Sequence, residues 1–239
     1  MATKRSYQQY CGLASALDVV GERWTLLIIR ELLLGPARYS DVLANLPGIG
    51  TNLLAERLKF LVQRGVARQV DLRGTGAQLA YELTPAGEEL RPLILGLTRW
   101  GMEFVDDLRP EDTLRPQWGF LAAEAMLDPT KVSDRHERYE FRVDDQVFHI
   151  ETSGGRARGL RGAAVDPVVV AKTDAATFVR IGSGHLTPLL AMLTGHLVLE
   201  GDVDAVLRCC ELLGLESASS RTVASRAVSA RSASSAAAG

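Results

Sequence analysis

Residues 40–81 decide the fold; they read SDVLANLPGIGTNLLAERLKFLVQRGVARQVDLRGTGAQLAY. Residues 40–46 have an amphipathic pattern that predicts a short helix, and Pro47-Gly48-Ile49-Gly50 ends it. Residues 51–63 predict a second helix, which a glycine ends. Two strand-like runs follow, joined through Arg73-Gly74-Thr75-Gly76. This order predicts a winged helix-turn-helix, in which a short turn holds the second helix at an angle that suits a DNA major groove.

The predicted helix over 51–63 has one apolar face, because Leu54, Leu58 and Leu61 fall within one stripe at helical spacing. The opposite face carries an asparagine and a threonine, which can read base edges, and an alanine, which can touch a thymine methyl group. An arginine on the helix shoulder, a serine starting the preceding helix and an arginine at the wing tip suit phosphates and the minor groove. The residues predicted to bind double-stranded DNA are Ser40, Thr51, Asn52, Ala55, Glu56, Arg57, Lys59 and Arg73.

Charge agrees with this prediction, since residues 51–73 hold five basic and two acidic side chains. The alternative is a winged helix that mediates only protein contacts. Glu56, in the middle of the exposed face, favours the alternative because a carboxylate repels phosphate. A carboxylate can also accept a hydrogen bond from cytosine, so DNA binding is the preferred interpretation.

The composition is that of an ordinary globular protein, with 46% hydrophobic and 23% charged residues among 239. No apolar run approaches the roughly 18 residues that cross a membrane, and the start has no signal-peptide core. Three cysteines, two of them adjacent, form no disulfide framework, so we expect a cytoplasmic protein that binds no membrane. The four histidines lack metal-ligand spacing and no phosphate-loop or nucleophile motif occurs, so we expect no metal, no cofactor and no enzyme activity.

The first predicted domain, 1–108, combines the DNA-binding unit with a dimerisation surface. Residues 11–34 predict two helices, and Thr84-Pro85 opens a long one that we expect to continue to Leu108. Its apolar positions keep helical spacing over five turns, more than a domain of roughly 80 residues needs to cover its own core. Part of this face is therefore predicted to form a homodimer; the alternative is that the second domain covers it.

A charged, proline-containing linker is predicted over 109–117 and an α+β domain over 118–214. The tail, 215–239, is almost entirely Ser, Ala, Arg and Val, which predicts disorder. The α+β pattern comprises a helix at 118–127, a hairpin at 138–143 and 146–151, a strand at 168–171, helices at 174–181 and 187–193, a strand at 197–200 and a helix at 203–213.

Several motifs resemble the HxlR-type winged-helix transcription regulators over about residues 8–107. They are Cys11-Gly12-Leu13, ALDVVGERWTLLIIREL at 16–32, RYSDV at 38–42, LPGI at 46–49, LAERL at 54–58 and YELTPAG at 81–87. The resemblance implies a homodimer on a palindromic operator, with terminal helices of the domain forming the interface, and we expect a repressor. This chain departs from the family in the wing, 72–78, and at Gly50, where a capping serine is common.

Cys11 matches a cysteine near the start of many such regulators, some of which sense oxidants or electrophiles. Sensing requires a thiolate, which a helix N-terminus favours, and Cys11 begins a predicted helix. The alternative is a buried, inert thiol, and that is the preferred interpretation.

The second domain resembles the end of sterol-carrier-protein-like domains, through residues 178–184, 187–195 and 197–202. The resemblance covers about 115–214 and implies helices over a curved sheet, with an apolar tunnel between them. A hydrophobic ligand bound in this tunnel would change the spacing of the two recognition helices. The alternative for the domain is a filled core without a tunnel. The alternative for the whole protein is a lipid-carrier or accessory protein whose winged helix contacts proteins. The predicted ligand-binding residues are Phe120, Phe141, Phe148, Phe178, Leu190, Leu193 and Leu197.

Overall fold

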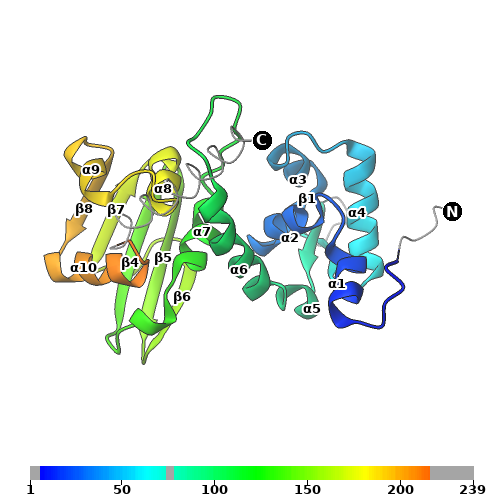
Figure 1. The fold of residues 1–239 in the computed structure, drawn as a ribbon, viewed down its shortest axis with the longest axis horizontal. Helices are drawn as coiled ribbons and strands as arrows, with labels where there is room; N and C mark the ends of the chain where they lie inside the picture. Colours follow the sequence, from blue (N-terminus) through cyan, green and yellow to red (C-terminus); the bar gives the residue numbers. More distant parts are fainter. Residues whose placement is uncertain (1–5, 74–77, 216–239) are drawn as a thin grey trace, which may run out of the picture. The chain divides into compact units, whose positions relative to one another are not determined.

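The computed structural model describes residues 6–73 and 78–215, and the chain divides into two compact units, Met1–Ile94 and Leu95–Gly239. The first unit is mainly helical with a small sheet (Figure 1). Its elements are α1 (Gly12–Val20), α2 (Thr25–Leu33), β1 (Ala37–Arg38), α3 (Tyr39–Asn45), α4 (Thr51–Gln63), β2 (Ala67–Asp71), β3 (Leu79–Leu83) and α5 (Pro85–Glu88).

The three strands of this unit form an antiparallel sheet in the order β1-β3-β2, and β2 and β3 are the wing strands. The apolar helix α2 is central, because Ile28, Ile29 and Leu32 are at most 1% exposed. Glu31, on the same helix, is 3% exposed and accepts hydrogen bonds from Arg30 at 2.8 Å and Asn45 at 3.0 Å. These partners allow a carboxylate to lie in the core. The predicted winged helix-turn-helix fold is confirmed.

The prediction of one continuous helix over 84–108 is wrong. Thr84 caps α5 as expected, with its hydroxyl accepting from the Gly87 N–H at 3.2 Å. The chain then turns at 89–90 and continues as α6 (Arg91–Gly101) and the 3-10 helix η1 (Met102–Phe104). The sequence places Pro92 inside the predicted helix; proline has no N–H for the carbonyl four residues earlier, so the ladder is interrupted there.

The second unit is a mixed five-stranded sheet with helices (Figure 1). The strand order is β6-β5-β4-β7-β8, with β4 and β7 parallel and the other neighbours antiparallel. No helix or strand occurs between η1 and α7, where the linker is predicted. The elements are α7 (Trp118–Met126), η2 (Pro129–Lys131), β4 (Glu137–Val143), β5 (Gln146–Ser153), β6 (Arg156–Arg161), β7 (Val169–Thr173), α8 (Ala175–Gly182), α9 (Pro188–Leu193), β8 (Leu197–Gly201) and α10 (Val203–Leu212).

The two faces of this sheet differ in chemistry. Strand alternation sends Tyr139, Phe141 and Val143 of β4 to one face, where all three are buried. Arg138 and Arg142 point to the other face and form ion pairs with glutamates, at 3.0 and 2.7 Å. The apolar face is covered by helices, as the contact between the Phe148 and Phe178 rings at 5.9 Å illustrates. The hydrophobic core of the unit therefore lies between the sheet and its helices.

Helix α10 is attached to the sheet by a partly buried ion pair. Arg208 donates to Glu137 of β4 through Nε at 3.0 Å, and the Tyr139 hydroxyl donates to the same carboxylate at 2.6 Å. Burial alone would raise the pKa of Glu137, but these hydrogen bonds outweigh burial and lower it. The charged form is therefore the one that holds α10 in place.

Two short strands were not expected from the sequence. β1 has only two residues, and β6 reads RARGLR, without the alternation of apolar and polar residues that predicts a strand. Apart from the long helix over 84–108, the helices and strands whose limits were predicted lie within two residues of those limits. The glycines of the wing tip and the predicted disordered tail beyond Leu215 lie outside the described residues.

Candidate nucleic-acid interface and apolar cavity

The turn between α3 and α4 fixes the angle of the second helix. Gly48 has a φ of +93°, a conformation that side chains rarely adopt. A Cβ there would lie 3.6 Å from the Trp24 ring, so the turn packs closely on the start of α2. The Tyr39 hydroxyl donates to the carbonyl of Thr51 at 2.7 Å and connects the first turns of the two helices.

Helix α4 spans residues 51–63 as predicted, and its two faces differ completely in exposure. Leu54, Leu58 and Leu61 are 0% exposed and anchor the helix in the core. The five predicted reading residues on the opposite face are all exposed: Thr51, Asn52, Ala55, Glu56 and Lys59. The structure therefore brings together a continuous polar surface of the kind that contacts base edges and phosphates.

Arg57 lies on the shoulder of α4 but its side chain is only 15% exposed. Its guanidinium donates to Glu22 and to Glu56, each at 3.1 Å, and its Nε is buried without a partner. Arg57 therefore ties α4 to the turn that precedes α2. Its predicted phosphate contact requires the side chain to leave at least one of these carboxylates.

Ser40 and Arg73, the remaining predicted contacts, are both exposed. The Ser40 hydroxyl donates to Asp41 at 3.3 Å, and the Arg73 N–H donates to Asp71 at 3.0 Å. Arg38 is not among the predicted contacts, but it is an exposed cation whose guanidinium donates to Gln78 at the base of the wing at 3.0 Å. Only the pairing of the two-residue strand β1 with β3 reveals this position, and no sequence pattern indicates it.

Cys11 is the N-cap residue of α1 and is exposed, so the preferred interpretation of a buried thiol is wrong for the single chain. The backbone N–H groups of Ala14 and then Leu13, at the start of the helix, favour the thiolate and lower the pKa of Cys11. The redox role of this cysteine stays a prediction.

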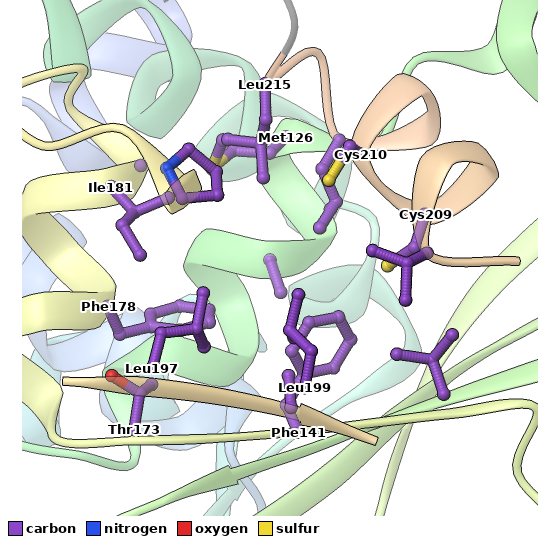
Figure 2. A pocket seen from close by; sticks show the side chains of 17 residues that line it. Met126, Phe141, Thr173, Phe178, Ile181, Leu197, Leu199, Cys209, Cys210 and Leu215 are labelled. Atoms are coloured by element: carbon purple, nitrogen blue, oxygen red, sulfur yellow. The ribbon is translucent and has the colours of Figure 1, made fainter. Parts of the chain in front are cut away.

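An apolar cavity of about 70 Å³ lies between the helices and the sheet of the second unit (Figure 2). Three of the predicted ligand-binding residues, Phe141, Phe178 and Leu197, line it. Phe120 and Phe148 are buried outside its lining, and Leu190 and Leu193 are 49% and 76% exposed on α9. The other lining residues are Ala123, Met126, Val169, Ala171, Thr173, Ile181, Gly182, Pro188, Leu199, Val206, Cys209, Cys210, Leu213 and Leu215.

The lining of this cavity contains no charged side chain. Burial raises the pKa of the Cys209 thiol, which is therefore neutral. The cavity suits an uncharged apolar group and offers no partner for a carboxylate or phosphate. The described ranges, 6–73 and 78–215, hold no group of three His, Cys, Asp or Glu side chains arranged for a metal ion, and none of their helices is long and apolar enough to cross a bilayer.

The first unit and its exposed helix define a winged helix-turn-helix protein, and comparison with known proteins agrees. The profile of the family described as HxlR-like helix-turn-helix matches residues 19–109. The uncharacterized HTH-type transcriptional regulator YvaP of Bacillus subtilis is 35% identical over 91 residues, which are 38% of this chain and 84% of that protein. The chain belongs to the HxlR-like helix-turn-helix family.

Two further relatives match a similar share of the chain. The HTH-type transcriptional regulator YodB of Bacillus subtilis is 33% identical over 102 residues, 43% of this chain and 88% of that protein. An uncharacterized HTH-type transcriptional regulator of Mycobacterium tuberculosis is 42% identical over 96 residues, 40% of this chain and 59% of that protein. These relatives are named as transcriptional regulators and not as enzymes, which agrees with the expectation of no enzyme activity.

Proposed function

We propose that this chain is a cytoplasmic transcription repressor that binds a palindromic operator as a homodimer. The observation that carries the proposal is the exposed polar face of α4, held outward by three fully buried leucines. The family profile covers this helix, and the relatives are named as HTH-type transcriptional regulators. We assign base reading to Thr51, Asn52 and Ala55, cytosine contact to Glu56, and phosphate contact to the predicted cations and Ser40.

The proposed dimer surface is an apolar stripe along α6 and η1. Leu93, Leu97, Trp100 and Phe104 recur at helical spacing and are 50% to 65% exposed. Exposed apolar stripes of this length mark association surfaces in soluble proteins. Pairing of two copies through this stripe would supply the two recognition helices that a palindromic operator requires. The proposed domains are 1–108 for DNA binding and dimerisation, 118–214 for the α+β body, 109–117 for the linker and 215–239 for the tail.

A nuclease footprint of the full chain on DNA from its own promoter region tests this proposal. We expect two protected half-sites with twofold sequence symmetry, whose centres lie about one helical turn, roughly 34 Å, apart. A matched footprint with Lys59→Ala protein should require more protein for the same protection. Absence of protection on any segment, or uniform protection without half-sites, would instead favour a winged helix that contacts proteins.

For the second domain we propose a sterol-carrier-like fold that binds a small apolar ligand and modulates DNA binding. The support is a mixed sheet under helices, with an uncharged cavity between them. At about 70 Å³, the cavity is smaller than an engineered apolar cavity of about 150 Å³ that holds benzene in another protein. It therefore suits a group of a few carbons, such as one end of a longer apolar molecule.

Arg99 is the residue that would couple ligand binding in this cavity to DNA binding. This arginine, in the last turn of α6, donates to the carbonyls of Ala125, Met126 and Leu127 at 2.9, 2.9 and 2.6 Å. Met126 also lines the cavity. A ligand that moves the C-terminal end of α7 would thus act on the helix that carries the proposed dimer stripe.

A further inference from the structure

The strand β8 is one edge strand of the C-terminal sheet (Figure 1). It pairs with β7 on one side, and α9 and α10 precede and follow it in the chain and contact it. Seven large apolar side chains of these three elements are 44% to 76% exposed. We call this group the β8 patch; its members are Leu189, Leu190, Met192, Leu193, Val198, Val203 and Leu207.

The size of the β8 patch matches that of a protein interface. At about 100 Å² for a fully exposed leucine or valine side chain, these residues present on the order of 400 Å² of apolar surface. A standard interface buries about 800 Å² on each partner, and roughly 56–65% of that area is apolar. A patch of this size is comparable to the largest apolar patch on a typical monomer, roughly 300–600 Å², and patches of that kind are often functional.

The opposite edge of the same sheet has a different character. β6 carries Arg156, Arg158 and Arg161, which are all exposed, and charged side chains on an edge strand prevent pairing with another strand. On β8 the only charged side chain is Glu200, and Lys172 of β7 neutralises it at 2.5 Å. The sheet is thus protected against edge pairing at β6 and open to it at β8.

The charge of the β8 patch determines which kinds of partner it can bind. Residues 188–207 contain no lysine and no arginine, but they contain Glu200, Asp202 and Asp204. An anionic membrane surface or a nucleic acid would be repelled, since both require cations on the protein. The acidic groups are compensated within the chain, because Asp202 caps α10 by accepting from the Ala205 N–H at 3.0 Å and Asp204 lies in the first turn of that helix.

We propose that the β8 patch binds the same patch of a second copy of this chain, with the two β8 strands paired antiparallel across a twofold axis. This arrangement is self-complementary, and it buries both open edges and both apolar surfaces at once. It closes after two copies, so no further chain can add to the sheet through β8. The contact is separate from the stripe on α6 and η1, and the chain would therefore have two surfaces for self-association.

Sedimentation equilibrium of the full chain over a wide concentration range tests the proposal. The patch variant combines Leu193→Lys and Val198→Lys, which place like charges on both copies at positions that tolerate solvent. The matched control is Val165→Lys, because Val165 is an apolar side chain of the same unit, 71% exposed outside the patch. A stripe variant, Leu93→Lys with Leu97→Lys, removes the proposed N-terminal contact, and thermal unfolding verifies that each variant is folded.

We expect the patch variant to have a lower average mass than the wild type and Val165→Lys, and the combined patch and stripe variant to be a monomer. An unchanged mass in the patch variant, with a fully monomeric stripe variant, would overturn the proposal and leave the N-terminal dimer intact. A monomeric patch variant with an unaffected stripe variant would support the β8 contact and refute the N-terminal dimer. The two surfaces are therefore tested separately.

Discussion

Among individual residues, Arg57 joins two parts of the first unit that lie far apart in the sequence. It pairs with Glu22 in the turn before α2, and Trp24 of the same turn packs on Gly48 between α3 and α4. Trp24 has a φ of +77°, which is strained for a tryptophan. The turn before α2 thus contacts both the turn between α3 and α4 and the middle of α4. The Arg57 side chain is shared between positioning α4 and the phosphate contact that we propose.

This sharing leads to a prediction for Glu22→Gln. If Arg57 must leave Glu22 to reach a phosphate, removing the carboxylate removes a competitor, and affinity should rise for DNA of every sequence. Exposed ion pairs contribute about 0.2–1 kcal/mol, so we expect a rise of about 1.4- to fivefold in a fluorescence anisotropy titration at low salt.

The control for this prediction is Glu88→Gln, since Glu88 has a similar exposure, 48% against 51%, and pairs with Arg91 away from α4. Both substitutions remove one negative charge from the first unit. If the two variants bind DNA equally well, Arg57 stays in its ion pair in the complex and acts only as a positioning residue.

The sequence was sufficient for residues whose role depends on local spacing. Leu54 and Leu58 follow the helical period, and Thr84 is a capping residue directly before a helix, so all three were predicted correctly. Partners that are distant in the chain could not be predicted. Nothing in the local pattern of Arg57 indicates Glu22, because only the packing of α4 against the preceding turn brings the two together.

At the scale of elements, helices with strong periodicity and clear end signals were predicted well, and α4 matches its predicted limits. The errors occur where a single residue interrupts a helical pattern, or where a strand has no alternation of apolar and polar residues. Pro92 divides the predicted helix over 84–108, although the apolar spacing continues through it. β6 is rich in arginine and glycine, and it forms because β5 offers a free edge for pairing.

The predicted ligand site shows the same limit. Phe141, Phe178 and Leu197 line one cavity, because they are apolar residues facing inward from adjacent elements. Their binding of a ligand stays a prediction. Leu190 and Leu193 were selected for the same apolar character, but α9 lies beside the edge strand and presents them to solvent. The apolar character of a residue predicts that it will be buried. The position of its helix in the fold determines whether it packs against the cavity, against another surface or not at all.

A prediction at this scale concerns α6 and α7, which Arg99 connects. Titration of the full chain with neutral apolar compounds, from benzene upward in size, should change its affinity for the footprinted DNA. Arg99→Ala should abolish this response while leaving ligand binding and basal DNA affinity within about twofold of wild type, because this arginine lines neither the cavity nor the α4 face. Isothermal titration calorimetry measures the ligand, and anisotropy measures the DNA.

A fully retained response in Arg99→Ala would exclude the route through α6. Lack of response to the whole panel in the wild type would leave the second unit as an element of assembly. The β8 patch offers such a role without any ligand.

For the whole molecule, the functions proposed for the two units rest on different kinds of observation. The family comparison covers 38% to 43% of the chain and concerns the winged helix-turn-helix. The role of the second unit rests on its own features, a cavity without charge and an edge strand without protection. The proposed contacts through α6 and β8 would give each copy two separate surfaces for self-association.

The central claim is that the exposed face of α4 reads DNA sequence. Its most direct test is a salt-dependent anisotropy titration of wild type, Asn52→Ala, Lys59→Ala and the matched control Lys131→Ala, each on the footprinted duplex and on a scrambled duplex. Asn52→Ala should lose about 1–3 kcal/mol on the operator alone, and Lys59→Ala should weaken both duplexes and reduce the salt slope by about one. If Asn52→Ala and Lys59→Ala both bind like Lys131→Ala and wild type, α4 is not the DNA-reading helix and the account is wrong.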